Sequence, residues 1–305
     1  MTADVVSADA YRRTFLRPVV VYNSVAFSEL NALKVAEVRY VVFSKGGKPR
    51  LGLTIGVGAD GRMRAPFSAP FACFDFNKEQ CVDVIVDAVG LLRCNFAGLV
   101  LTLPPTLYAP SMIAKTAIAL NHSGARRLYD DWNYHLPLAA SGGYGSLVDS
   151  YTRRVVASGA ATGYGLLEVA DDPWRAYAVV AANHEAKGYP MRMTERQVVA
   201  TAGKGGPVKG RFFVLTNGVE DAAAAIVYDV TPAVSQVIYW GDAPRHGCRY
   251  AMNLLAARLY EYYSSRGKSI LDIGPSSSEG IPATGLCNFK ESIGCIVSSK
   301  PTFEL

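Results

Sequence analysis

The sequence lacks the features that mark membrane-spanning and secreted proteins. Among its 305 residues there is no run of about 18 apolar residues, so no membrane-spanning helix is expected. The first residues, MTADVVSADAYRRTF, contain no apolar core of a signal peptide. Six cysteines are present, but none forms a CxxC pair and most lie in apolar segments, as small buried residues do. We therefore expect a reducing compartment, the cytoplasm.

Several classes of catalytic and binding site are also missing. The net charge is +5, and no block of about five or more like charges occurs, so a dedicated nucleic-acid tail is not expected. The four histidines are scattered and form no metal-binding motif. The sequence GYGSLV around Ser146 lacks the second glycine of a nucleophile elbow, and GKGGPVKG lacks the ending of a phosphate-binding P-loop.

Hydrophobic residues make up half of the chain, enough for one large core or for two cores of about 150 residues each. Residues 1–16 are interpreted as a polar lead-in. The glycines between Lys45 and Lys48 predict a hairpin between two β-rich runs. Apolar periodicity predicts four longer helices, over residues 78–94, 110–121, 174–186 and 249–266. The fold class is therefore α/β, in the mixed α+β sense.

The order of elements occurs twice along the chain. Three pairs of glycines mark equivalent points, namely a hairpin turn, the start of a buried strand and the end of the following helix. The pairs are Gly46 with Gly218, Gly98 with Gly267 and Gly124 with Gly294, which are 172, 169 and 170 residues apart. A nearly constant offset indicates two copies of one unit. The glycine-rich stretch 141–145 is the expected linker, which predicts domains 1–143 and 144–305.

The second copy carries the strongest candidate site, between residues 236 and 294. Its order is strand, loop, helix, strand, loop, helix, and functional groups of such units collect on the loops that follow the strands. Asp272 lies in the strand KSILDI, and a hydroxyl-rich loop follows it. Asp272 is equally compatible with a turn ligand. Lys290 lies on the short helix beside apolar neighbours, where it either faces an oxyanion or phosphate or extends into solvent.

The loop that precedes the long helix is a second candidate. Backbone N–H groups at a helix N-terminus bind pyrophosphate or carboxylate groups, and Arg245 and Arg249 add positive charge there. An ordinary strand-to-helix turn explains the same residues. Tyr239 and Trp240 precede this loop, where they either line a substrate groove or belong to the core.

The motif LDIGPSS…GLCNFKESIGC resembles the D-φ-G-x-S…G…F-K-x-x-φ-G pattern of the FemAB-like branch of the GNAT acyltransferases. The segment from Ser146 to Leu167, with Arg153 and Arg154, is similar to the helix and strand that open the second domain in that branch. The resemblance covers nearly the whole chain. It implies two tandem GNAT-like domains, each with a mixed, mostly antiparallel sheet flanked by helices.

The resemblance also implies a function, an N-acyltransferase that moves an acyl or aminoacyl group to an amine. The donor would be an acyl-CoA such as acetyl-CoA, or an aminoacyl-tRNA. The acceptor would be a small molecule or a cell-envelope precursor, and no metal would be needed. Lys290 would stabilise the tetrahedral oxyanion or hold a phosphate, and Asp272 would order the loop or orient the amine. The remaining site residues would be Arg245, Gly247, Arg249, Trp240, Ser276 and Ser277 for the donor, and Tyr239 and Phe289 for the substrate.

The sequence departs from the family pattern at three points. The pyrophosphate loop Q/R-x-x-G-x-G/A is not matched at residues 245–251. Pro275 stands where the D-φ-G-R-S form of the motif has arginine. No long charged helical arm is present. Two other functions therefore stay open. One is a non-catalytic binding module that keeps the fold, and the other is an aminoacyl-tRNA-dependent peptidyltransferase.

Overall fold

A computed structural model describes all 305 residues and separates into two compact units. Unit 1 consists of Met1–Asn133, Ser277–Pro282 and Ser298–Leu305, and unit 2 of Tyr134–Ser276 and Ala283–Val297. The chain changes units within strands β6 (Arg126–Pro137) and β14 (Ile296–Glu304). This division follows packing, whereas the boundary expected after residue 143 concerns the sequence repeat and stays a prediction. None of the helices combines the length and the apolar character that crossing a bilayer requires.

The sheet of unit 1 has the strand order β1-β2-β3-β4-β5-β14-β6. Besides β6 and β14, its strands are β1 (Thr2–Val6), β2 (Glu37–Lys45), β3 (Lys48–Val57), β4 (Met63–Ala65) and β5 (Val100–Thr102). The pairs β1–β2, β2–β3, β3–β4 and β5–β14 are antiparallel, and β4–β5 is parallel. A small hairpin of β12 (Ser277–Ser278) and β13 (Ile281–Pro282) also belongs to this unit.

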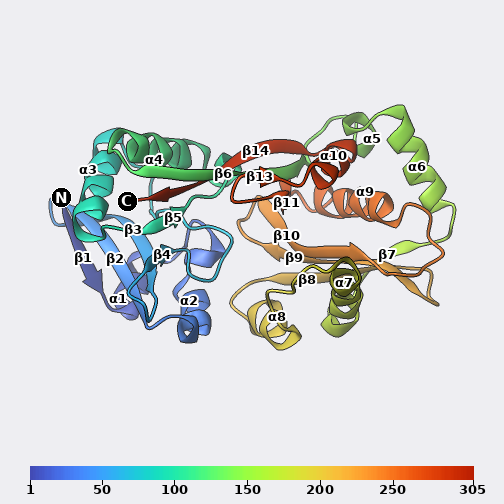
Figure 1. Ribbon diagram of the computed structural model, residues 1–305, viewed down its shortest axis with the longest axis horizontal. Coiled ribbons are helices and arrows are strands. Elements are labelled where there is room, and N and C mark those ends of the chain that lie inside the picture. The colour runs from blue at the N-terminus through green and yellow to red at the C-terminus, as the bar shows by residue number, and fades with distance from the viewer. The chain divides into compact units, whose positions relative to one another are not determined.

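Helices cover both faces of this sheet, with α3 and α4 on one side and α1 and α2 on the other (Figure 1). The helices are α1 (Ala8–Thr14), α2 (Val25–Asn31), α3 (Val82–Asn95) and α4 (Pro110–His122), with 3-10 turns at Val21–Asn23, Ala32–Lys34 and Thr106–Tyr108. The prediction of a polar lead-in over residues 1–16 is wrong. Strand β1 pairs with β2. Tyr11 of α1 and Phe15, which follows α1, are buried. Their rings give this segment an apolar face, although many of its other residues are polar.

The sheet of unit 2 has the order β6-β11-β10-β9-β8-β7. Its further strands are β7 (Gly165–Glu168), β8 (Gly210–Thr216), β9 (Asp221–Asp229), β10 (Val234–Asp242) and β11 (Ile270–Pro275). The pairs β7–β8, β8–β9 and β9–β10 are antiparallel, whereas β10 and β11 are parallel. Each unit therefore has the mixed, mostly antiparallel sheet with flanking helices that the sequence predicts.

The helices of unit 2 lie on opposite faces of its sheet, α9 and α10 on one and α7 and α8 on the other (Figure 1). They are α5 (Tyr144–Leu147), α6 (Ser150–Ala160), α7 (Pro173–Lys187), α8 (Glu195–Ala202), α9 (Ala251–Ser264) and α10 (Thr284–Ser292). Helix α9 supplies much of the core, because its leucine and alanine stripe packs against alternate residues of the strands. All four predicted helices are confirmed, and α3 begins at Val82 instead of residue 78.

Local signals explain where these elements begin and end. Ser24 and Thr194 cap α2 and α8 through their side chains, and Gln197 completes a capping box with Thr194. The six glycines that mark the repeat all have positive φ angles, between 60° and 88°. Because residues with a side chain rarely adopt this conformation, glycine recurs at the same points of the two copies.

Candidate functional site

Strands β10 and β11 stop pairing before either strand ends. Their parallel ladder ends where Gln236 lies beside Asp272, although β10 continues to Asp242 and β11 to Pro275. On its other side β10 stays paired with β9, with an irregularity between Val237 and Tyr239. The backbone of β11 beyond Asp272 therefore has no ladder partner on β10, and its buried carbonyl groups need other donors.

Lys290 of α10 supplies these donors. Its Nζ donates hydrogen bonds to the carbonyl oxygens of Ile273, Gly274 and Pro275, at 3.3, 2.9 and 3.1 Å. The side chain is 2% exposed, and Nζ lies 5.7 Å from the centre of the Tyr134 ring. The interpretation that Lys290 extends into solvent is therefore wrong. Since an ammonium group has three protons, a ligand must replace one of these carbonyls, of which Ile273 is the most distant.

Burial sets the charge state of this lysine. It lowers the pKa of Lys290 to about 8, while the negative charge of Asp272 acts in the opposite direction. The group is therefore a cation at neutral pH, but one that loses its proton more readily than a surface lysine. A cation held in a low-dielectric position interacts strongly with any negative charge that develops beside it.

Asp272 orders the turn that Lys290 binds. Its side chain is fully buried, Oδ1 accepts from the backbone N–H of Gly274, and Oδ2 accepts from Nε2 of Gln236, both at 2.9 Å. Gly274 has a φ of 79°, so the chain turns sharply directly after the carboxylate. These are the contacts of a turn ligand, and they fix the backbone whose carbonyls face the ammonium.

The two serines of the predicted donor site differ in their surroundings. Ser276 is buried, its Oγ has no hydrogen-bond partner, and its carbonyl oxygen accepts from the N–H of Ala283 at 2.9 Å. Ser277 belongs to unit 1, where its Oγ donates to Asp131 at 2.7 Å and accepts from the N–H of Trp132 at 2.8 Å. The hydroxyl of Ser277 thus attaches the β12–β13 hairpin to β6.

The loop before α9 is occupied by a carboxylate. Arg245, Gly247 and Arg249 are all exposed, and the N–H of Gly247 donates to Oε1 of Glu220 at 2.8 Å. The hydroxyl of Tyr164 binds the same oxygen of Glu220. Because a carboxylate repels a phosphate, a pyrophosphate group can use the Gly247 N–H only after Glu220 has moved away.

Tyr239 and Trp240 point to opposite faces of β10, as successive strand residues do. The ring of Trp240 lies 6.2 Å from that of Phe289 on α10. The hydroxyl of Tyr239 instead accepts from the N–H of Met193, after α7, and its ring lies 5.7 Å from that of His184. The structure therefore places Trp240 and Phe289 on the α10 side of the sheet and Tyr239 on the other side. Asp272 is linked to Lys290 through the Gly274 turn, whose N–H the carboxylate binds and whose carbonyl the ammonium binds.

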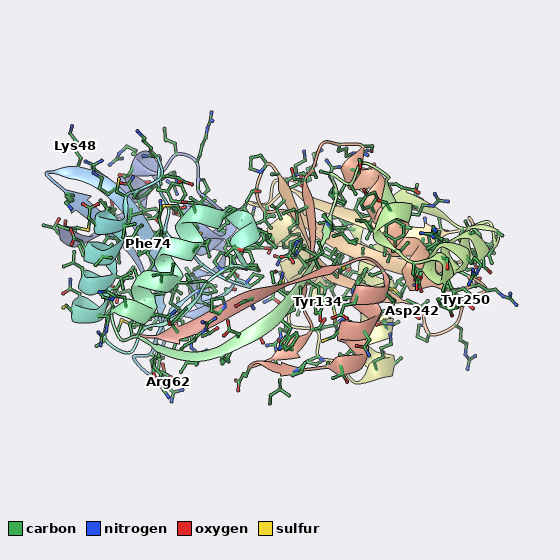
Figure 2. The ribbon with its side chains drawn as sticks, turned by 90° about the horizontal axis from the view of Figure 1, so that it is seen from above. Lys48, Arg62, Phe74, Tyr134, Asp242 and Tyr250 are labelled. Atoms are coloured by element: carbon green, nitrogen blue, oxygen red, sulfur yellow. The ribbon has the colours of Figure 1, made fainter.

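Sequence reasoning missed the contribution of β6. Tyr134, labelled in Figure 2, is fully buried, and its hydroxyl donates to Oε1 of Glu291 at 2.9 Å. The next residue, His135, lies close enough to Asp272 for the carboxylate charge to act on its imidazole. The only signal was the alternation of polar and apolar residues in NYHLPL, which places Tyr134 and Leu136 on the core face.

A cavity of about 560 Å³ lies elsewhere in unit 2, against α5, α6 and the C-terminal half of α9. Tyr144, Arg153, Tyr260 and Glu261 are among the residues that line it. None of the site residues predicted from the sequence lines this cavity.

Comparisons with known proteins support the resemblance at the level of the fold. No family model and no curated sequence matches the chain. Among solved structures, FemX has a TM-score of 0.68 and 10% sequence identity, covering 100% of this chain and 98% of its own. The C-terminal domain (DUF2156) of a putative lysylphosphatidylglycerol synthetase from Agrobacterium fabrum has a TM-score of 0.61 and 13% identity, covering 98% of this chain and 92% of its own. L-PGS from Bacillus licheniformis has a TM-score of 0.58 and 10% identity, and the match covers 97% of this chain and 90% of that protein. The chain thus has the FemX-like fold that the resemblance implies.

Proposed function

We propose that the protein is an N-acyltransferase that moves an acyl or aminoacyl group from an activated donor to an amine, with the donor site in unit 2. The observation that carries the proposal is the Lys290 ammonium, buried at the point where β10 and β11 separate. The predicted acceptor is a small molecule or a cell-envelope precursor, and the predicted compartment is the cytoplasm.

The role proposed for Lys290 is electrostatic. Attack of an amine on an ester or thioester gives a tetrahedral intermediate with a negatively charged oxygen. A preorganised ammonium stabilises this oxygen more than it stabilises the neutral carbonyl of the donor, which is the condition for lowering the barrier. Ile273, at 3.3 Å, is the carbonyl that the oxyanion would replace.

The contact between Glu220 and Gly247 favours one kind of donor. Coenzyme A carries a pyrophosphate, and the N–H group expected to bind it is already bonded to a carboxylate. An aminoacyl-tRNA has its ester at the end of a long polyanion and does not require that group at the same place. We therefore propose aminoacyl-tRNA as the first donor to test and acetyl-CoA as the second.

The test replaces Lys290 by methionine, which keeps the length of the side chain and removes its charge. Lys268→Met is the matched control, because Lys268 is also well covered and donates to a carbonyl, that of Thr231 at 3.1 Å, away from the end of β11. We expect a loss of about 100-fold or more in transfer for Lys290→Met, the scale of removing one oxyanion donor, and a small change for the control.

Two further measurements make this test decisive. Thermal unfolding of each variant shows whether the fold survives, and Lys290→Arg keeps the cation if methionine does not fold. In the unaltered protein, transfer should decline as the pH rises through the pKa of about 8, because the ammonium is then lost. Full activity of Lys290→Met would remove this lysine from the mechanism.

The second candidate function is a binding module without catalysis. It is favoured by one observation, namely that all three protons of Lys290 already have acceptors within the protein. A thermal-shift series with acetyl-CoA, longer acyl-CoAs and charged tRNA separates the two, since a ligand that binds only the folded state raises the midpoint. A shift without any transfer to amines supports the binding module. Binding of tRNA that weakens steeply with salt supports a tRNA-dependent enzyme.

A further inference from the structure

His135 lies directly opposite Asp272 on neighbouring strands. The N–H of Leu138 on the β6 side donates to the carbonyl of Ser269 before β11 at 2.8 Å. In an antiparallel pair, each step back along one strand matches a step forward along the other. His135 is three residues before Leu138 and Asp272 is three residues after Ser269, so the two lie side by side. The same alignment places Tyr134 and Leu136 with Ile273 and Leu271, and all four belong to the core beneath α9. His135 and Asp272 therefore share the opposite face.

This face carries a row of polar side chains across four strands. Asp272 pairs with Gln236 of β10, and Gln236 pairs with Tyr228 of β9. Residues that lie directly opposite on neighbouring strands have their side chains on the same side of the sheet. In this row the Nδ1 atom of His135 and the hydroxyl of Tyr228 are buried and have no hydrogen-bond partner. A buried polar atom without a partner is rare and calls for a functional or structural reason.

Acyl transfer to an amine needs a group that takes up a proton. The attacking amine becomes positively charged in the tetrahedral intermediate and must lose a proton before or while the donor's oxygen or sulfur leaves. The proton acceptor has to be unprotonated near neutral pH and close to the end of β11. His135 is half-buried, so it is not sealed inside the core as Asp272 is.

Four other ionisable groups near the end of β11, namely Asp272, Lys290, Tyr134 and Cys295, do not meet these conditions. Asp272 is fully buried and both of its oxygens accept hydrogen bonds. Lys290 donates its protons to backbone carbonyls. The hydroxyl of Tyr134 donates its proton to Glu291, and burial raises its pKa. Burial also raises the pKa of the Cys295 thiol, which is therefore protonated.

The charges around His135 suit a proton acceptor. Burial lowers the pKa of its imidazole, so the ring is neutral at pH 7, and the negative charge of Asp272 on β11 partly opposes this shift. That charge favours the protonated ring once it forms. Lys290 of α10 also interacts electrostatically with Asp272.

We propose that His135 is the proton acceptor of the transfer reaction, a proposal that rests on the function proposed above. The amine nitrogen forms a bond to the donor's carbonyl carbon, and one proton of the resulting ammonium moves to the imidazole. The bond from that carbon to the donor's oxygen or sulfur then breaks, and the imidazolium returns the proton to the leaving atom. The products are an amide and the free donor alcohol or thiol, so no further reactant is required.

The test compares His135→Gln with His122→Gln, an exposed histidine at the end of α4 in unit 1. Transfer is measured from alanyl-tRNA and from acetyl-CoA to lysine, glycine amide and a lysine-containing muropeptide. We expect kcat to fall about 100-fold or more for His135→Gln, the scale of a general base, and to stay within about twofold for the control. The rate of the unaltered protein should fall as the pH drops through the pKa of His135, which burial holds below the ordinary histidine value, and His135→Gln should lack this decline.

A second variant protects the test against a folding defect. His135→Ala with added imidazole should regain part of the lost rate, which a purely structural role would not produce. If the unaltered protein transfers and His135→Gln matches both its rate and its pH profile, the assignment of His135 alone is overturned. No transfer by the unaltered protein to any acceptor would overturn the proposed function, and the role of His135 with it.

Discussion

Asp75 should make unit 1 less stable as the pH rises toward neutrality. This residue lies between Phe74 and Phe76 in the segment that connects β4 with α3, and it is fully buried. Its carboxylate accepts from the hydroxyl of Tyr11 at 2.8 Å, the N–H of Val19 at 2.8 Å and Nδ2 of Asn23 at 3.0 Å. All three donors are neutral. Burial therefore outweighs the hydrogen bonds and raises the pKa of Asp75 from 3.8 to about 6.

The sign and size of the effect follow from this shift. Between pH 3.8 and about 6 the folded protein keeps the Asp75 proton while the unfolded chain has already lost it. The unfolded state then binds fewer protons, so the free energy of unfolding falls as the pH rises through this window. A shift of this size corresponds to about 3 kcal/mol, since each pKa unit is worth about 1.4 kcal/mol.

Asp75→Asn tests this reasoning because asparagine has nearly the same shape. Its oxygen can accept from Val19 and Asn23, and its amide can donate to the oxygen of Tyr11. We expect the variant to gain stability relative to the unaltered protein as the pH rises from 4 to 7, by up to about 3 kcal/mol. Comparing the two proteins at each pH cancels the contributions of other carboxylates.

The assay is urea unfolding at several pH values, combined with hydrogen exchange of the Val19 amide, whose proton is bonded to Asp75. The exchange measurement is needed because two units can unfold separately, and it reports on unit 1 alone. A difference between the two proteins that stays constant from pH 4 to 7 would show that Asp75 titrates at its ordinary value. That result would refute the conclusion that burial controls the charge of this carboxyl group.

Two further predictions concern local packing and a loop. Gly159→Ala should destabilise unit 2 by about 1–3 kcal/mol, because a Cβ there would lie 2.7 Å from the carbonyl oxygen of Arg249. Gly90→Ala in α3 is the control, because a Cβ there meets no atom within 4 Å, and it should stabilise unit 1 by up to about 1 kcal/mol. Thermal unfolding that shows a change of the same sign for both variants would contradict this. Hydrogen bonds from Tyr164 and Gly247 hold the pKa of Glu220 below its usual range, so this contact should be lost as the pH falls through that lowered value. The protection of the Gly247 amide, measured as its exchange rate relative to an unprotected amide at the same pH, should therefore fall in acid. In Glu220→Gln this protection should not depend on the titration. Equal pH profiles of protection in the two proteins would show that Glu220 does not hold the loop.

The sequence by itself determined the local elements and their repetition. Apolar periodicity predicted α9 and α7, and glycines predicted the turns, because each of these depends on residues within a few positions of one another. The motif around Asp272 and Lys290 indicated the FemAB-like fold for the same reason, since it is a short pattern of fixed spacing.

Only the tertiary structure decided how the candidate site residues are used. Lys290 is buried because β11 leaves β10 and exposes three carbonyls, which depends on the pairing of strands that are distant in sequence. Glu220, in the turn between β8 and β9, accepts a hydrogen bond from Gly247 in the loop before α9. Asp272 acts electrostatically on His135, which is 137 residues earlier in the chain (272 − 135). Such contacts are set by strand register and burial, and no pattern within a single segment encodes them.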